Sequence, residues 1–156
     1  MVPKKIVFAM AACLLLAAAV SVSAQPGTPT PTPPKPLPNP ILYLTGVEYY
    51  TAGGKDFTRY KYAVDNSTAY PDTLFAAAPT LPPCGTNTNS SRSWVDVFDS
   101  RSKRLYGFCA FRSAADLNKI WFALETGVVP PSYVYIEIND RSTNMKYKSN
   151  LADTVE

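Results

Sequence analysis

The chain has 156 residues with 15 basic and 12 acidic side chains, and it contains no histidine. This length suffices for one domain, and the lack of histidine removes the usual general base, the Ser-His-Asp and Cys-His catalytic arrangements, and most zinc or copper sites. Once Lys4, Lys5 and Lys35 are set aside, 12 basic and 12 acidic side chains remain. A neutral domain has no electrostatic footprint for nucleic acid and little attraction to an anionic membrane surface.

Residues 1–24 have the pattern of a secretory signal peptide. Two lysines precede the apolar run Ile6–Val20, which is too short to span a bilayer comfortably. Small residues at 22–24 predict cleavage before Gln25. The expected protein is secreted or extracytoplasmic, in the periplasm or at the cell surface, with no membrane insertion after cleavage. An uncleaved membrane anchor is the alternative.

Residues 25–40 are predicted to form a disordered linker rich in proline and threonine. Eight of these sixteen residues are proline, and such a composition favours extended polyproline-like conformations over a packed core. At about 3 Å per residue, the segment would reach some 50 Å. It is interpreted either as a spacer from an anchor or as a leader left after cleavage.

Two stretches near the start of the domain have the composition of strands. Residues 41–51 are rich in β-branched and aromatic side chains, and a glycine-containing turn separates them from 57–65. In 57–65 the side chains alternate, which predicts a strand with one buried and one solvated face. The buried face is expected to carry Tyr60, Tyr62 and Val64, and the solvated face Arg59 and Lys61.

Two cysteines, Cys84 and Cys109, remain once the signal peptide is removed. In an oxidising compartment such a pair predicts one disulfide. Cys84 lies in the irregular stretch 69–93, where Pro79, Pro82 and Pro83 exclude a central strand or a continuous helix. The bridge is expected to tie this long loop to the second strand of a hairpin at 94–111.

That hairpin is centred on a polar turn, and on its return run Leu105 and Gly107 are expected to share a face. The next stretch, 113–127, fits either a helical stripe or a strand. A strand at 118–124 is favoured because every neighbouring element is a strand.

A second hairpin is predicted from Tyr133 to Ser149, where Tyr133–Asn139 gives the clearest strand pattern in the chain. Residues 151–156 are expected to be a flexible tail. Seven or so short strands separated by turns predict an all-β fold, an antiparallel two-sheet β-sandwich over residues 41–150.

Two segments, F-T-R-Y-K-Y-A-V-D and Y-V-Y-I-E-I-N-D, and the run of short strands around them carry a family resemblance. They resemble a bacterial fibronectin type III or immunoglobulin-like extracellular module. The resemblance covers roughly residues 41–150 and implies the sandwich fold. It implies no particular activity, because such modules carry many functions.

Carboxylates are the remaining candidates for catalysis or metal binding. The pairs Asp96 with Asp99 and Glu137 with Asp140 have the residue types that a glycoside hydrolase needs, and the same turns hold a few oxygen ligands of the kind that calcium prefers. Their strand and turn positions are typical of solvated surface or turn-forming residues. The sequence therefore predicts no catalytic residue, no metal and no cofactor.

Aromatic residues are the most distinctive feature, with ten tyrosines, seven phenylalanines and two tryptophans. Most are expected in the core, but Trp94, Phe98, Tyr133 and Tyr135 are predicted on the face opposite the apolar one. An exposed strip of this kind binds sugars or protein partners; alternatively, lysine and arginine stems cover it.

These observations predict a non-catalytic interaction module with an unknown protein or glycan partner outside the cytoplasm. A carbohydrate-binding module that uses the aromatic strip is the alternative. A small hydrolase that works without histidine is a third hypothesis, from a different class.

Overall fold

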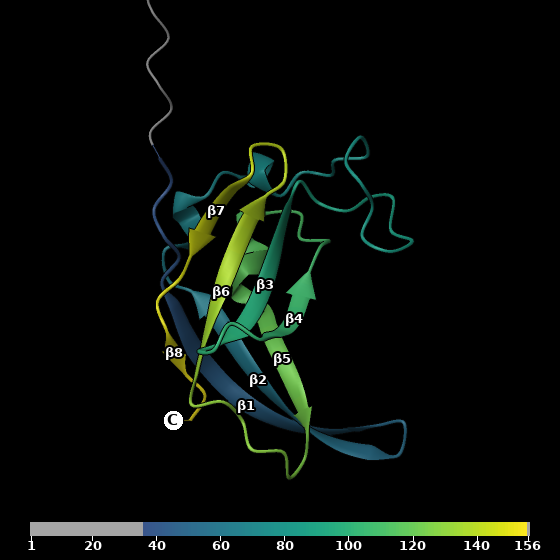
Figure 1. Cartoon of the computed structure of the whole chain (residues 1–156), viewed down its shortest axis with the longest axis vertical. Helices are drawn as coiled ribbons and strands as arrows, with labels where there is room; N and C mark the ends of the chain where they lie inside the picture. The colour runs from purple at the N-terminus through teal and green to yellow at the C-terminus, as the bar shows by residue number, and fades with distance from the viewer. Residues whose placement is uncertain (1–35, 156) are drawn as a thin grey trace, which may run out of the picture. The chain divides into compact units, whose positions relative to one another are not determined.

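The computed structural model describes residues 36–155 (Figure 1), so the predicted signal peptide and most of the linker lie outside the described residues. Within this range the chain is all-β, with two antiparallel sheets and no α-helix, which confirms the predicted β-sandwich class. The described part contains no helix that is long and apolar enough to cross a membrane.

The two sheets form separate layers whose strands cross in Figure 1. One has the order β1 (Leu42–Ala52), β2 (Lys55–Val64), β5 (Ile120–Glu125). The other has the order β4 (Arg104–Phe108), β3 (Ser93–Asp99), β6 (Tyr133–Asp140), β7 (Met145–Lys148), with β8 (Ala152–Asp153) also paired to β6. Three short 3₁₀ turns lie between strands, at Ser67–Ala69, Asp72–Leu74 and Ala114–Asn118.

Strand β2 has the predicted alternation, and its apolar face forms the centre of the core. Tyr60, Tyr62 and Val64 are all buried. The ring of Phe122 on β5 stacks at 4.9 Å from Tyr60 and at 6.0 Å from Tyr62. Each fully buried side chain of this size stabilises the fold by about 1.5–3 kcal/mol, so this cluster holds the three-stranded sheet onto the second layer.

The ambiguous stretch 113–127 contains the favoured strand, which begins at Ile120. A 3₁₀ turn precedes it, and there the carboxylate of Asp116 accepts hydrogen bonds from the backbone N–H groups of Arg112 and Ser113. The capping pattern of Ser113 and Asp116 therefore belongs to this short turn, whereas most of the helical stripe lies in β5.

The hairpin β3–β4 is confirmed, but the expected common face of Leu105 and Gly107 is wrong. Phe98 lies opposite Arg104 and Val97 opposite Tyr106, so Leu105 is an extra residue that forms a β-bulge. The bulge reverses the alternation, and Leu105 packs against the core while Gly107 lies opposite Asp96.

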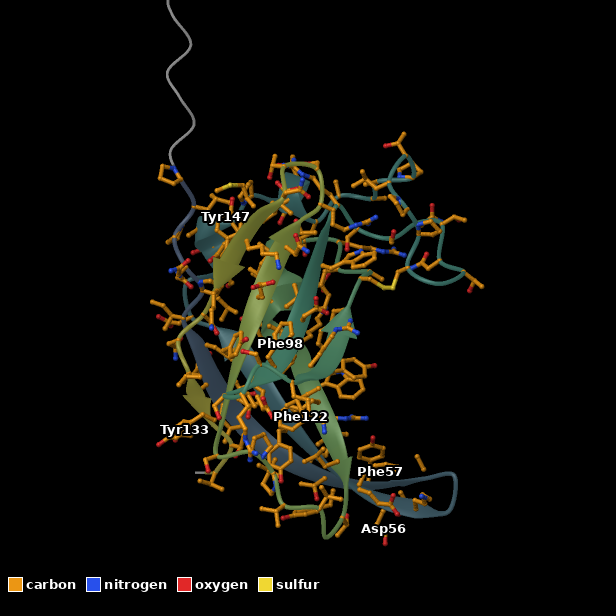
Figure 2. The ribbon with its side chains drawn as sticks, viewed as in Figure 1. Asp56, Phe57, Phe98, Phe122, Tyr133 and Tyr147 are labelled. Carbon is orange, nitrogen blue, oxygen red and sulfur yellow. A yellow bond between two sulfur atoms is a disulfide. The ribbon has the colours of Figure 1, made fainter. Side chains whose placement is uncertain are left out.

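The predicted disulfide between Cys84 and Cys109 is confirmed, with the two Cα atoms 6.2 Å apart (Figure 2). Cys109 follows the last residue of β4, so the bridge ties the long loop to the end of the hairpin. Arg141 is a second anchor for this loop, because its guanidinium donates to the carbonyl oxygens of Ser91 and Pro82.

The folded region extends further at both ends than the sequence predicts. Tyr70 donates a hydrogen bond of 2.6 Å to the carbonyl oxygen of Pro38, in the expected linker. The expected tail is wrong at Ala152–Asp153, which form β8 against Tyr133–Val134. The physical reason is that β7 covers only part of the edge of β6, and the remaining N–H and C=O groups need partners.

Asn150 connects the two sheets at the point where the chain passes from β7 to β8. Its side-chain oxygen accepts a 2.7 Å hydrogen bond from the N–H of Leu42, and its amide nitrogen donates to the Leu42 carbonyl oxygen at 3.0 Å. The asparagine thus pairs with the start of β1 as a neighbouring strand would.

Reduction of the disulfide should destabilise the domain. The bridge closes a loop with a sequence separation of 25, for which the chain-entropy model gives about 3 kcal/mol. Urea unfolding with and without reductant measures the difference. The double variant Cys84→Ser/Cys109→Ser is the control, because reductant should not change its stability. Equal stability of the wild type under both conditions would contradict the prediction.

The substitution Asn150→Ala should lower the free energy of unfolding by about 2 kcal/mol, because it leaves both backbone groups of Leu42 without their partners. Chemical denaturation measures the loss. Asn89→Ala serves as the control, since Asn89 is exposed. If both variants lose the same amount, Asn150 does not brace β1.

Candidate functional site

The predicted aromatic strip lies on the outer face of the five-stranded sheet, but it is not a continuous exposed surface. Phe98 and Tyr135 are cross-strand partners with stacked rings 5.2 Å apart. Trp94 is separated from them by the pair Asp96 and Glu137. Figure 2 shows Phe98 near the middle of the sheet and Tyr133 at its margin.

Basic side chains lie over two of the four aromatic rings on this face, as in the alternative interpretation of the sequence. The Lys148 ammonium lies 4.0 Å from the ring centroid of Tyr135, and the Arg141 guanidinium 4.1 Å from that of Trp94. Tyr135 is only 6% exposed, whereas Tyr133 at the end of β6 is 45% exposed. The structure therefore brings Phe98 and Tyr135 together, and a ligand-binding role for the four residues stays a prediction.

The carboxylates considered for catalysis all have structural partners. Asp96 pairs with Arg104 at 2.7 Å and Glu137 with Lys146 at 2.7 Å. Asp99 accepts hydrogen bonds from two backbone N–H groups in its own turn. No group of three or more acidic, cysteine or histidine side chains arranged to hold a metal occurs within residues 36–155.

Asp140 is the most deeply buried of these acids. Burial by itself would raise the pKa of Asp140, but hydrogen bonds from Arg92, Thr143 and Ser142 outweigh it and hold the pKa well below its usual range. The Arg92 guanidinium binds both carboxylate oxygens, at 2.9 and 2.6 Å. This arrangement fixes the β6–β7 turn and leaves the carboxylate no free position for chemistry.

The outer face of the three-stranded sheet has a different character, because it contains a hollow of about 800 Å³. Ala63, a small residue opposite Tyr43, lines this hollow, and Gly46 lies opposite the lining residue Lys61. Large side chains surround these positions and leave the space between them unfilled. We call this region the outer hollow; its main lining residues are Tyr43, Thr45, Arg59, Lys61, Asn118, Lys119 and Trp121.

Trp121 forms one wall of the outer hollow and is held in place from two sides. The Arg59 guanidinium lies 4.8 Å from its ring centroid and 4.3 Å from that of Tyr50. The ring of Tyr106, on β4, lies 4.4 Å from Trp121. These contacts hold the indole in place beside the outer hollow.

The polar groups of the outer hollow differ in how closely they are paired, and Lys119 forms a close ion pair with Asp116 at 2.9 Å. Arg59 and Lys61 share the carboxylate of Glu48 at 3.6 and 3.7 Å, distances too long for hydrogen bonds. The side chains of Tyr43 and Thr45 form no hydrogen bond within the described residues. Donors that have no fixed partner are available to a ligand.

Sequence reasoning placed Arg59 and Lys61 on a solvated face but did not combine them with Trp121. The missing information was the pairing of β2 with β5, which sets Lys61 directly opposite Trp121. The alternation of Ile120, Trp121 and Phe122 was a usable signal, since it puts the tryptophan outward once this stretch is taken as a strand.

Comparison of the chain with protein-family models, with curated proteins and with solved structures found no match.

The structural role of Asp140 can be tested by measuring how its substitution changes the dependence of stability on pH. Since the pKa of Asp140 is lower in the folded than in the unfolded protein, its contribution is complete above the ordinary carboxyl pKa of about 3.9 and is lost as the pH falls below it. Asp140→Asn should therefore cost about 2 kcal/mol at pH 7 and flatten the acid limb of stability. Asp65→Asn, at an exposed position, is the control. An unchanged acid limb in Asp140→Asn would refute this role.

Proposed function

We propose that the chain is an exported, non-catalytic binding module that holds a saccharide in the outer hollow. The observation that carries this proposal is the combination in one concave site of a tryptophan held by its neighbours and two cations, Arg59 and Lys61, whose ion pairs with Glu48 are longer than hydrogen bonds. Ligand sites are typically concave, with aromatic walls and a few polar groups that set orientation.

A saccharide fits this combination better than an apolar ligand does. Sugar rings present C–H groups that pack on an aromatic face, and their hydroxyl groups need hydrogen-bond partners at the same time. The exposed ring of Tyr43 supplies an aromatic face, and Trp121, which Arg59 and Tyr106 already contact, supplies the wall beside it. Thr45 and Asn118 supply donors and acceptors at the rim.

The non-catalytic part of the proposal is supported by what the acids do. The sequence has no histidine, so acid–base chemistry would fall to Asp or Glu. Asp65 is the one acid among the lining residues of the outer hollow. Of the acids near it, Glu48 lies beside two cations, and Asp116 is bound by Lys119 and by backbone N–H groups. A pair of carboxylates facing a common space is what hydrolysis of a glycosidic bond requires.

An extracytoplasmic location is supported by the disulfide, which persists in oxidising compartments, and by the signal-like residues 1–24. The finer kinship to immunoglobulin or fibronectin type III modules is supported by strand order. The pairings β1-β2-β5 and β3-β6-β7 correspond to the A-B-E and C-F-G sets of an immunoglobulin-type sandwich. Strand β4 differs from the constant-type D strand, since it pairs with β3.

The proposal is tested by titrating the ¹⁵N-labelled domain with a panel of neutral and acidic oligosaccharides. At least one should shift the backbone amide signals of residues 43–46, 61–65 and 118–121. Tyr43→Ala should weaken binding about fivefold, equivalent to about 1 kcal/mol.

Tyr133→Ala is a matched control, because Tyr133 is 45% exposed and Tyr43 is 46% exposed. It should bind as the wild type does. Loss of binding in Tyr133→Ala alone would place the ligand on the five-stranded sheet. Failure of every saccharide to shift any signal would refute the proposed function.

A further inference from the structure

We infer that the protein forms a two-fold dimer in which the free edge of β1 pairs, antiparallel, with β1 of a second copy. The pairing segment is residues 47–51, which we call the open edge, and the two-fold axis passes through Tyr49. The inference goes beyond the proposed function and does not depend on it. It is carried by outward-pointing backbone groups along β1 and by an exposed tyrosine beside an apolar hollow.

The tight turn after β1 determines which backbone groups point away from the sheet. Gly53 and Gly54 both have positive φ, 59° and 75°, as in the two-residue hairpin turn whose flanking residues exchange two hydrogen bonds. Here the flanking pair is Ala52 with Lys55. Bonded and non-bonded pairs alternate from there along an antiparallel ladder. The residues whose N–H and C=O groups point away from β2 are therefore Val47, Tyr49 and Thr51.

Contacts on the far side of β2 agree with this alternation. Asp56 lies opposite Thr51, and its carbonyl oxygen accepts a hydrogen bond of 2.8 Å from the N–H of Thr126, on the side away from β1. Thr51, as the other member of a non-bonded pair, directs its own groups to the opposite side. Within the described residues β1 pairs with no strand except β2, and no other backbone group bonds to the open edge. Each outward-pointing residue thus offers both of its backbone groups to a further strand.

The open edge is the least protected edge of the two sheets. Short strands, bulges and lysines discourage an edge from pairing with another chain. The edge strand β7 has two lysines in four residues, β8 has only two residues, and β4 has the bulge at Leu105. At the edge of β5, the ring of Tyr106 lies 4.4 Å from Trp121. The open edge contains no lysine, arginine or proline, and the bulge of β1 lies before it.

The side chains next to the open edge are self-complementary. Tyr49 lies on the same face as Val47, which packs against the core, yet Tyr49 is 75% exposed. The reason is that the β1–β2 hairpin extends beyond the second sheet (Figure 1). Beside Tyr49 is a hollow of about 510 Å³ whose lining includes the exposed Val128 and Val155. A two-fold axis at Tyr49 brings the ring of each copy to the hollow of the other, which makes one patch serve both subunits.

Charge also favours a second copy as the partner. With Tyr49 opposite its own copy, Glu48 lies opposite Tyr50 of the partner subunit, so the like-charge repulsion that cross-strand pairs can suffer is absent. The Arg59 guanidinium lies 4.3 Å from the ring centroid of Tyr50. The partner subunit's Arg59 therefore brings positive charge toward Glu48. The same register sets outward-pointing residues opposite one another along the whole open edge.

Sedimentation equilibrium of the purified protein tests the dimer. An edge contact is small for a stable interface, so the measurement extends to about 0.5 mM protein. Tyr49→Lys should weaken the dimer about tenfold or more, because two ammonium groups would then face each other at the axis. Tyr43→Lys is the control, since Tyr43 lies on the same strand before the bulge and is 46% exposed; this variant should dimerise as the wild type does.

Amide hydrogen exchange identifies the surface that forms the dimer. In the wild type at high concentration, the N–H groups of residues 47, 49 and 51 should exchange slowly, and dilution or the substitution Tyr49→Lys should make them exchange fast. The N–H groups of Glu48 and Tyr50, which bond to β2, should stay protected under both conditions. The comparison by dilution uses the wild type alone, so it does not depend on the folding of a variant.

Three results would overturn the inference. One is a monomer at every concentration up to about 0.5 mM. Another is a dimer that Tyr49→Lys leaves unchanged. The third is a dimer in which dilution does not alter exchange at residues 47, 49 and 51, since a different surface would then form the contact. No saccharide enters these measurements, so such a failure leaves the proposed function untouched.

Discussion

The alternation of side chains along β2 is the constraint from which both the core and the outer hollow arise. Tyr60, Tyr62 and Val64 are buried against the second sheet, and the residues between them project from the opposite face because successive side chains in a strand point to opposite sides. A slip of one residue in the register of β2 would expose the tyrosines and bury Arg59 and Lys61 at the same time. The stability of the fold therefore fixes the orientation of the site.

Basic side chains have different roles on the outer faces of the two sheets. Both carry aromatic rings beside basic side chains, and a cation over a ring is favourable at either place. On the five-stranded sheet, Lys148 and Arg141 lie over Tyr135 and Trp94 and reduce their exposure. On the three-stranded sheet, Arg59 lies over the rings of both Tyr50 and Trp121 and holds the indole beside the hollow. The basic residues thus shield aromatic rings from solvent on the five-stranded sheet, and on the three-stranded sheet Arg59 positions a ring.

Sequence patterns predicted where the strands lie better than they predicted which segments pair with or cover one another. The strands, the central hairpin and the disulfide followed from periodicity, turn residues and cysteine count, which are local properties. The bulge at Leu105 was not predictable, because an extra residue in one strand leaves the composition unchanged and reverses the faces beyond it. The short strand β8 was missed since its pairing depends on a vacant length of β6 and not on its own two residues. The aromatic residues were assigned to the correct face of β3 and β6, but the cations that cover them come from elsewhere in the chain.

The outer hollow depends most strongly on topology, because it combines residues from strands that are distant in sequence. Lys61 and Trp121 meet only since β5 returns from the second layer to pair with β2. Stability alone does not explain the loose pairing there, as the same chain pairs Asp96 with Arg104 and Glu137 with Lys146 at 2.7 Å. Exposed ion pairs contribute little to the free energy of folding, so the fold places little constraint on how closely these side chains pair. The saccharide that we propose for the outer hollow would add contacts to Trp121 and to the two cations that share Glu48.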